Sequence, residues 1–166
     1  MNTLIAIITS LLGLVPVCFI SEDRADVIVY EDSIGEMELD RFYQDLKHEK
    51  NLYEVYIIDK SPLRFKVKYN QLGDDENVKE GWVEKEQCGV YLRPNGYTED
   101  GIGFLHLYTS AECKEYLRLY NVGTPLVPVV DYSCETRCLQ VCIRINETEI
   151  VGWINRFCPY IYNSCT

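Results

Sequence analysis

A degenerate internal repeat constrains the fold of this chain more than any other feature. Gly81-Trp82-Val83 and Gly152-Trp153-Ile154 each end an ordered series of short apolar segments. The matching segments before them are 27–30 with 104–108, 55–59 with 127–131, and 65–69 with 139–143. A single shared Gly-Trp pair would carry little weight, but four matches in the same order indicate a duplication. We therefore expect two small domains rather than one large fold.

Short runs of alternating apolar and polar residues, bounded by turn residues, predict an all-β protein. The expected strands are 26–31, 53–59, 63–69, 78–84, 89–92, 103–108, 116–120, 126–131, 138–145, 150–155 and 159–162. Residues 73–77 and 145–149 are typical hairpin loops. Residues 36–50 have apolar spacing that a helix could use, but the match with the second half favours an irregular loop containing a strand or one helical turn.

The first twenty residues contain no charged side chain, and the polar sequence begins abruptly at Ser21. Gly13 and Pro16 interrupt the apolar run, which is more typical of a secretory leader than of a membrane-spanning helix. We predict a signal peptide over 1–21 and an exported protein that is periplasmic, secreted or on the cell surface. An uncleaved N-terminal anchor is the alternative, because no Lys or Arg precedes the apolar run.

The charge of the chain excludes one large class of partner. Its net charge is −10 at pH 7, and neither half offers a basic face that would neutralise phosphates. We expect no nucleic-acid partner, and no membrane span once the leader is cleaved. The partners that remain are proteins, peptides and neutral cell-wall glycans.

Cysteines are concentrated in the second half, where an even set indicates disulfides in an oxidising compartment. The candidates are Cys113, Cys134, Cys138, Cys142, Cys158 and Cys165. The sequence does not decide their connectivity, and the closest pair to expect is Cys158 with Cys165.

Strand alternation places Cys138 and Cys142 on the solvated face of 138–145. We therefore expect Cys142 to pair with Cys134, Cys113 or another nearby cysteine. Cys88 is then left over, either buried or reactive. Zinc is disfavoured because the chain has two histidines and no Cys-x-x-Cys, and we expect no metal and no cofactor.

Residues 95–101 form the best linker, because Pro94 and two glycines break both periodicities. The domains are then 22–94 and a cysteine-rich 102–166. Each half resembles a bacterial SH3-like (SH3b) domain: an opening strand ending in Tyr30 or Tyr108, a long loop, a strand ending in Asp59 or Asp131, a strand of the Phe65-Lys66-Val67-Lys68 kind, and the Gly-Trp pair. The resemblance implies two small SH3-like, partly open β-barrels in tandem. Family members usually serve as non-catalytic targeting or binding modules in envelope proteins.

The aromatic residues divide into structural and binding candidates. Trp82 and Trp153 recur at the same place in both halves, which favours a structural role in closing each core. Exposed tyrosines are better contact candidates, because aromatic side chains that gather at a groove bind peptides or sugars. The candidate ligand-binding residues are Tyr30, Tyr53, Tyr56, Tyr91, Tyr116, Tyr120, Tyr160 and Tyr162.

Catalysis has little support in the sequence. Cys88 with His106 is the one nucleophile and base pair that can be constructed, and nothing local recommends it. We predict no enzyme, but an exported, non-catalytic binding or targeting module that contacts a cell-envelope component or a partner protein. The alternative is an acidic inhibitor or immunity-type protein that covers a basic partner, and this class of binding would weaken steeply with salt.

Overall fold

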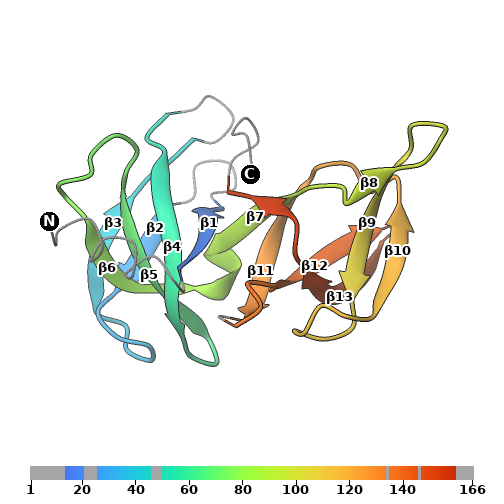
Figure 1. Ribbon diagram of the computed structural model, residues 1–166. Coiled ribbons are helices and arrows are strands. Elements are labelled where there is room, and N and C mark those ends of the chain that lie inside the picture. Colours follow the sequence, from blue (N-terminus) through green and yellow to red (C-terminus); the bar gives the residue numbers. More distant parts are fainter. Residues whose placement is uncertain (1–13, 21–25, 46–49, 134, 146, 160–166) are drawn as a thin grey trace, which may run out of the picture.

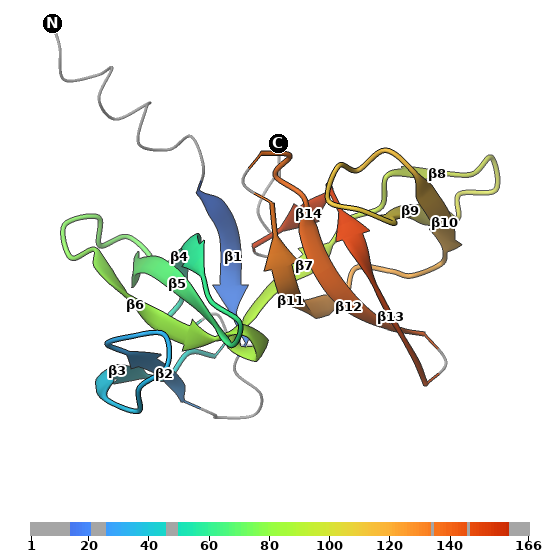
Figure 2. The ribbon, with the colours of Figure 1, turned by 90° about the horizontal axis from the view of Figure 1, so that it is seen from below.

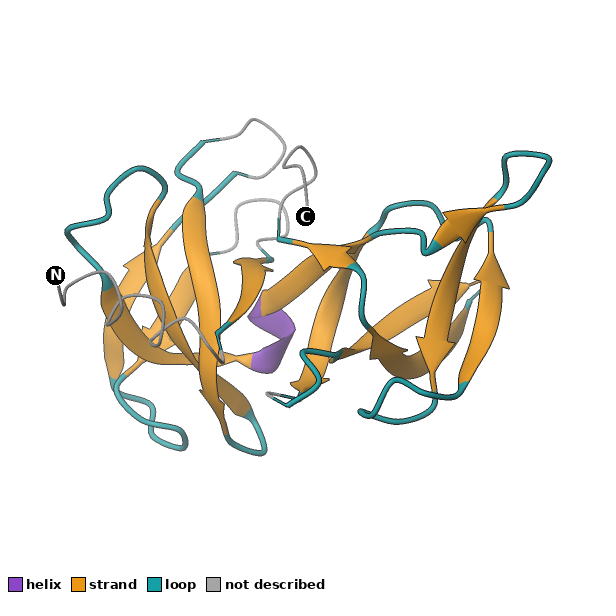
Figure 3. Cartoon of the chain, in the orientation of Figure 1, coloured by secondary structure: helices purple, strands orange, loops and turns teal. Residues whose placement is uncertain are grey.

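The computed structural model describes residues 14–20, 26–45, 50–133, 135–145 and 147–159 of the 166-residue chain. These residues form an all-β, antiparallel structure with one short 3-10 turn, η1 (Lys85–Gln87), which confirms the predicted all-β class (Figure 3). Within the described ranges, no helix is long and apolar enough to cross a membrane. The strands are β1 (Val15–Phe19), β2 (Val27–Tyr30), β3 (Glu38–Phe42), β4 (Tyr53–Lys60), β5 (Arg64–Gln71), β6 (Lys79–Glu84), β7 (Cys88–Leu92), β8 (Gly96–Tyr97), β9 (Gly103–Tyr108), β10 (Tyr116–Tyr120), β11 (Leu126–Tyr132), β12 (Leu139–Ile145), β13 (Thr148–Ile154) and β14 (Phe157–Cys158).

Two lobes stand side by side, with β1 and β7 between them (Figure 1). We call β1 to β6 the first lobe and β7 to β14 the second lobe. Their strands form one hydrogen-bonded series in the order β3-β2-β6-β5-β4-β1-β7-β11-β12-β13-β9-β10. Counted inward from its outer end, each lobe has the same strand order: β3-β2-β6-β5-β4-β1 in the first lobe corresponds to β10-β9-β13-β12-β11-β7 in the second. Strand β1 is therefore the counterpart of β7. The duplication therefore includes one more strand at the start of each half than the sequence comparison indicated.

The strand registers match the two lobes residue by residue. In the first lobe, Val67 lies opposite both Ile57 and Gly81, and Tyr30 lies opposite Trp82. In the second, Val141 lies opposite both Val129 and Gly152, and Tyr108 lies opposite Trp153. Both lobes also carry a register shift at the same place, between Ile57 and Asp59 and between Val129 and Asp131. Matching bulges of this kind support a common frame.

Close packing explains why glycine precedes each tryptophan. A Cβ added at Gly81 would lie 2.2 Å from Cγ1 of Val29, and one added at Gly152 would lie 2.5 Å from Cγ of Leu107. Val29 and Leu107 each precede the tyrosine that faces the tryptophan. In both lobes, glycine lets the strand that carries the tryptophan approach the strand that ends in the paired tyrosine, which is β2 in the first lobe and β9 in the second.

Strand β1 lies within the segment that the sequence analysis assigns to a leader. It pairs with β4 on one side and with β7 on the other. Val15, Val17, Cys18 and Phe19 are all buried. The structure thus uses residues 15–19 as a central strand of the sheet, which the predicted domain boundary at residue 22 leaves out.

The described strands form one antiparallel sheet that runs through both lobes, and no barrel is closed by hydrogen bonds among them. The described backbone therefore does not show the expected pair of separate barrels. The first lobe curls until β3, at the end of the hydrogen-bonded series, comes close to β1. The rings of Phe42 and Phe19 lie 5.2 Å apart between centroids, and Gln44 Nε2 donates to the carbonyl of Phe19. Besides the β1 and β7 pair, a polar contact joins the lobes, since Lys60 Nζ lies 2.6 Å from Asp131 Oδ1. Figure 2 shows the lobes joined along β1 and β7 from below.

The predicted strands are close to those observed. Residues 103–108 and 116–120 coincide with β9 and β10, and 36–50 contains β3 as the match between halves favoured. The predicted linker is partly wrong, because its residues 96–97 form β8 and pair with β9. Nothing in the sequence marked Gly96 and Tyr97 as strand, since a two-residue strand has no periodicity.

The cysteine predictions need correction. A disulfide joins Cys113 to Cys138, whereas Cys142 is a free thiol. Cys138 precedes β12 and is buried, so the alternation that placed it outward does not apply to it. Cys142 lies opposite Val151 on the outer face, as expected, but without the predicted bridge.

The predictions for Cys158 and Cys88 have different outcomes. Cys158 is disulfide-bonded, but its predicted partner Cys165, like Cys134, lies outside the described residues. Cys88 is free and fully buried in the core, which favours the structural interpretation of this residue over the reactive one.

Candidate functional site

The outer face of the second lobe carries a continuous run of aromatic side chains. Alternation along β9 places Phe104, His106 and Tyr108 on one face, while Leu105 and Leu107 point into the core. Across the hairpin, β10 presents Tyr120, Arg118 and Tyr116 directly opposite these three residues. We call the aromatic ladder the set Phe104, His106, Tyr108, Tyr116, Tyr120 and Trp153, the last of which faces Tyr108 from β13.

Ring geometry shows that the ladder is built from direct contacts. His106 stacks on Tyr116, with centroids 3.8 Å apart and planes 17° from parallel. Phe104 lies nearly parallel to His106 at 5.5 Å and edge-on to Tyr120 at 6.3 Å. Tyr108 meets Tyr116 edge-on at 5.5 Å. Stacked and edge-on pairs at these distances are the arrangements that aromatic rings prefer.

One cation is integrated into the ladder. The Arg118 guanidinium lies 4.4 Å from the Phe104 ring centroid, within cation–π range. Hydrogen bonds to the hydroxyls of Tyr120 and Tyr116 raise the pKa of Arg118. Burial and the charge of Arg118 together lower the pKa of His106 below its ordinary value. His106 is therefore a neutral ring at pH 7, which suits stacking better than a charged imidazolium.

His106 also has an unused polar atom. Its Nε2 is buried and has no hydrogen-bond partner among the described residues. A buried nitrogen without a partner is unusual and costs free energy. The ladder therefore holds one polar atom, beneath its surface, that no described residue satisfies.

Asparagines hold the ladder from behind. The backbone N–H of His106 donates to Asn95 Oδ1 at 2.7 Å, and Asn155 Nδ2 donates to the Tyr108 hydroxyl at 3.0 Å. Asn95 Nδ2 donates in turn to Asn155 Oδ1 at 3.3 Å. Because these bonds come from two different loops, they fix the rings before any ligand arrives.

The ladder is open to solvent on its β10 side. Tyr116 and Tyr120 are 44% and 54% exposed, and β10 is the last strand in the hydrogen-bonded order. Trp153 is half-buried on the same face. Trp82 is half-buried at the equivalent place in the first lobe, while Val83 beside it is buried. Neither indole is among the fully buried core residues, and the structural role expected for both stays a prediction.

The corresponding face of the first lobe is charged. There the Arg64 guanidinium covers the Tyr30 ring at 3.6 Å and pairs with Glu84 at 2.9 Å. Arg41 pairs with Glu38 at 2.7 Å, and Lys66 lies 3.6 Å from Glu80. Both lobes thus pair a tyrosine with a tryptophan in the same register. Arginine and its ion pairs surround the tyrosine in the first lobe, whereas aromatic rings surround it in the second.

Of the six predicted contact tyrosines that the structure describes, two meet at one site. Tyr116 and Tyr120 lie in the ladder, whereas Tyr30 lies beneath Arg64. Tyr53 stacks on Phe42 inside the first lobe, with centroids 4.1 Å apart. Tyr56 lies opposite Pro16, Tyr91 lies opposite Leu126 and Cys158, and Tyr160 and Tyr162 are outside the described residues.

Sequence reasoning missed Phe104, His106, Tyr108 and Arg118. The alternation of side chains along β9 could have placed the first three on one face. Which residues of β10 lie opposite them depends on the register of the hairpin, which the sequence does not show. The sequence offered His106 as the base of a pair with Cys88, whereas its contacts with Phe104 and Tyr116 place it within the ladder.

The one catalytic pair that the sequence offered is not assembled. Cys88 lies in the core, where burial raises the pKa of its thiol, while His106 lies on the outer face of β9. A nucleophilic cysteine needs the opposite shift. Among the described residues, no three His, Cys, Asp or Glu side chains are grouped as metal ligands.

Comparison of the chain with protein-family models, with curated proteins and with solved structures gives no match. The function must therefore be inferred from the aromatic ladder and its surroundings.

Proposed function

We propose that this protein is a non-catalytic binding module that uses the aromatic ladder to hold a neutral ligand, with a cell-envelope glycan as the first candidate. The observation that carries the proposal is the contact between rings on an exposed face, from His106 on Tyr116 to Phe104 beside Tyr120. The apolar face of a sugar ring would cover such rings as another apolar surface does. An extended peptide is the other ligand of this chemistry.

The charge distribution favours a neutral ligand at this face. The six residues of the ladder carry no formal charge at pH 7, because the lowered pKa keeps His106 neutral, and Arg118 is occupied by two tyrosines and a ring. The chain as a whole carries a net charge of −10. A ligand held here would gain from desolvation and stacking more than from ion pairing.

We also propose that each lobe is a variant of the SH3-like unit that the sequence resembles, and that the protein acts after export. The meander β4-β5-β6, the Gly-Trp pair and the η1 turn before β7 support the first statement. The Cys113 to Cys138 disulfide and the bonded Cys158 support the second, since such bridges persist in oxidising compartments. A mass measurement of protein secreted by its own cell, without reduction, would report leader cleavage and the number of bridges.

Binding is tested with isolated peptidoglycan and with a soluble N-acetylglucosamine oligomer as probes, using sedimentation for the first and Trp153 fluorescence for the second. Tyr116→Ala and Tyr120→Ala should each weaken binding by about tenfold or more, as expected for central aromatic contacts. Leu117→Ala is the matched control, because Leu117 lies between them on β10, is 62% exposed and points to the other face. Equal loss in all three variants would contradict the proposal.

Salt separates the proposal from the acidic-inhibitor alternative. Stacking should change binding by less than about threefold between 0.05 and 0.5 M NaCl, because little of it depends on charge. Docking of the acidic surface on a basic partner would weaken by orders of magnitude over the same range. A partner protein from envelope extracts that binds with that steep dependence, and is insensitive to Tyr120→Ala, would favour the inhibitor.

A further inference from the structure

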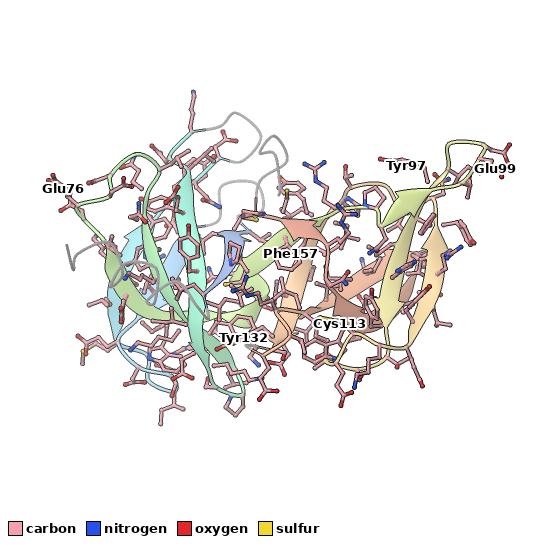
Figure 4. The ribbon with its side chains drawn as sticks, viewed as in Figure 1. Glu76, Tyr97, Glu99, Cys113, Tyr132 and Phe157 are labelled. Atoms are coloured by element: carbon pink, nitrogen blue, oxygen red, sulfur yellow. A yellow bond between two sulfur atoms is a disulfide. The ribbon has the colours of Figure 1, made fainter. Side chains whose placement is uncertain are left out.

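A cleft where the two lobes meet reverses the charge of the rest of the molecule. It has a volume of about 780 Å³ and is formed by the start of β1, the loops on either side of β8, the β11–β12 loop and the segment around β14. Three arginines line it, Arg93, Arg137 and Arg156, and none of the described residues that line it is acidic. Phe157 and Tyr97, labelled in Figure 4, supply aromatic surface from β14 and β8.

Two of the three guanidinium groups are available to a ligand. Arg137 and Arg156 are both exposed, and no ion pair involves either of them among the described residues. Arg156 Nη1 makes one long contact, of 3.5 Å, with the backbone carbonyl of Asn95. Acidic residues are in excess in the chain, yet Arg137 and Arg156 form no ion pair with a carboxylate of the described residues, which leaves both guanidinium groups able to bind an anion.

The cleft is anchored to ordered structure. Asn95 and Asn155 both line it, and they are the two asparagines that hold the back of the aromatic ladder. Arg137 follows the turn after β11, where its backbone adopts a left-handed conformation with φ of 57°. The guanidinium groups therefore come from short loops attached to β7, β11 and β13, and not from long mobile segments.

The structure assigns to this cleft a binding site for a small oxyanion, a molecule that carries two or three carboxylate or phosphate groups. The guanidinium fork matches the planar or tetrahedral oxygens of either group and binds them in bidentate fashion. The volume is that of a small-molecule site. Long polyanions are disfavoured because the surrounding surface repels them, whereas a small anion inside the cleft lies within a screening length of the arginines.

This inference is independent of the aromatic ladder and reverses part of the sequence-based conclusion on charge. Summed over the chain, the charge predicts repulsion of phosphate. Arg93, Arg137 and Arg156 are far apart in the sequence, so only the fold brings them to one cavity.

The test titrates the full chain with citrate and, separately, with pyrophosphate by isothermal calorimetry at low ionic strength. We expect saturable binding of at least one probe at a single site. Arg137→Gln and Arg156→Gln should each weaken it about tenfold or more, as the loss of a charge-assisted contact does. Citrate alone indicates a carboxylate ligand, pyrophosphate alone a phosphate ligand, and both together an oxyanion site of broad preference.

Arg144→Gln is the matched control, because Arg144 is also an exposed arginine of the second lobe but lies on the β12–β13 hairpin and pairs with Glu149. It should leave the affinity within about twofold. Absence of saturable binding for both probes, or equal weakening by Arg144→Gln, would overturn the inference. Thermal unfolding of each variant shows whether it is folded, and the Trp153 signal with the glycan probe reports separately on the ladder.

Discussion

Tyr30 and Tyr108 face Trp82 and Trp153 in the same register, yet the two lobes cover these rings in different ways. In the first lobe the buried guanidinium of Arg64 lies over the tyrosine and pairs with the half-buried Glu84. In the second, the same face continues into the rings of β9 and β10. The close contacts of Gly81 and Gly152 and the buried valines recur in both lobes, so the fold requires them. The side chains of the outer face differ between the lobes, so the fold permits variation there.

That divergence has a physical basis. Val67 and Val141 are fully buried between neighbouring strands, so a change there alters packing on all sides. Residues on the outer face contact only their neighbours on the same face, and they can be replaced as a group. One lobe carries charged pairs that fix its surface, and the other carries rings that are partly exposed. We therefore expect the first lobe to contribute mainly stability and the second lobe recognition.

The largest expected effect concerns β1, whose place in the first lobe is that of β7 in the second. Phe19 and Leu92 end these strands and are both buried, at 0% and 1% exposed. Truncating either to alanine should lower the free energy of unfolding by about 3–5 kcal/mol for Phe19 and about 2–5 kcal/mol for Leu92. Urea denaturation of the protein in its mature form measures both. If Phe19→Ala leaves the stability of the mature protein unchanged while Leu92→Ala lowers it, β1 is absent from the mature form. The leader predicted over 1–21 would then be removed together with β1.

A smaller effect should follow from filling the space beside each tryptophan. Gly81→Ala and Gly152→Ala should each destabilise the protein by about 1–3 kcal/mol through overpacking. Gly81→Ala should cost more, because Val29 has little rotamer freedom and the Tyr30 carbonyl lies 3.2 Å from the added Cβ. The three atoms nearest to a Cβ at Gly152 all belong to the more flexible side chain of Leu107.

Gly103→Ala provides the control for these two variants. The nearest atom to a Cβ at Gly103 is 3.4 Å away, an ordinary contact, so this variant should stay close to the wild-type stability. If Gly152→Ala is instead the more damaging change, the packing of β6 on β2 in the first lobe is not equivalent to the packing of β13 on β9 in the second.

The sequence was sufficient to predict most of the frame and little of the sites. Strands such as β9 alternate between a buried and an exposed face, and alternation is visible in a sequence. β1 was missed because Val17, Cys18 and Phe19 are buried on both faces, which produces a continuous apolar run like that of a leader.

The sites depend on long-range placement that a single sequence does not contain. Tyr116 and Tyr120 are exposed as expected. Four other tyrosines chosen by the same criterion lie elsewhere in the described structure, and Tyr160 and Tyr162 lie outside it. The arginine cleft combines residues from β7, β11 and β13 loops, and its charge is opposite to the net charge of the chain. Composition averages over distance, so it could not reveal a local excess of arginine.

Ion pairs provide the third comparison between the lobes. The Arg64 side chain is 9% exposed and donates to the carbonyls of Asp32 and Gly35 as well as to Glu84. Arg64→Gln should therefore lower the free energy of unfolding by about 1–3 kcal/mol, because the hydrogen bonds that the buried guanidinium donates are lost. Arg144→Gln in the second lobe should change it by less than about 1 kcal/mol, since Arg144 and Glu149 are 72% and 57% exposed. Chemical denaturation at low and high salt measures both variants, and equal costs would show that the covering of Tyr30 is not a stabilising feature of the first lobe.

The smallest effect concerns pH, and it should be confined to the second lobe because the position equivalent to His106 is Ile28. The pKa of His106 is lowered by burial and by Arg118, so the unfolded chain takes up a proton at about pH 6.5 before the folded one does. The contribution of His106 to stability is thus fully present above pH 6.5 and decreases as the pH falls below that value. His106→Phe keeps a stacked ring without a titratable nitrogen, and the difference in unfolding midpoint between the two proteins should change sign or shrink between pH 7.5 and 5.5. His48 is present in both proteins and cancels from that difference. A difference that is constant over this range would show that His106 is no more buried in the folded chain than in the unfolded one, and the neutral, stacked ring on which the ladder depends would have to be abandoned.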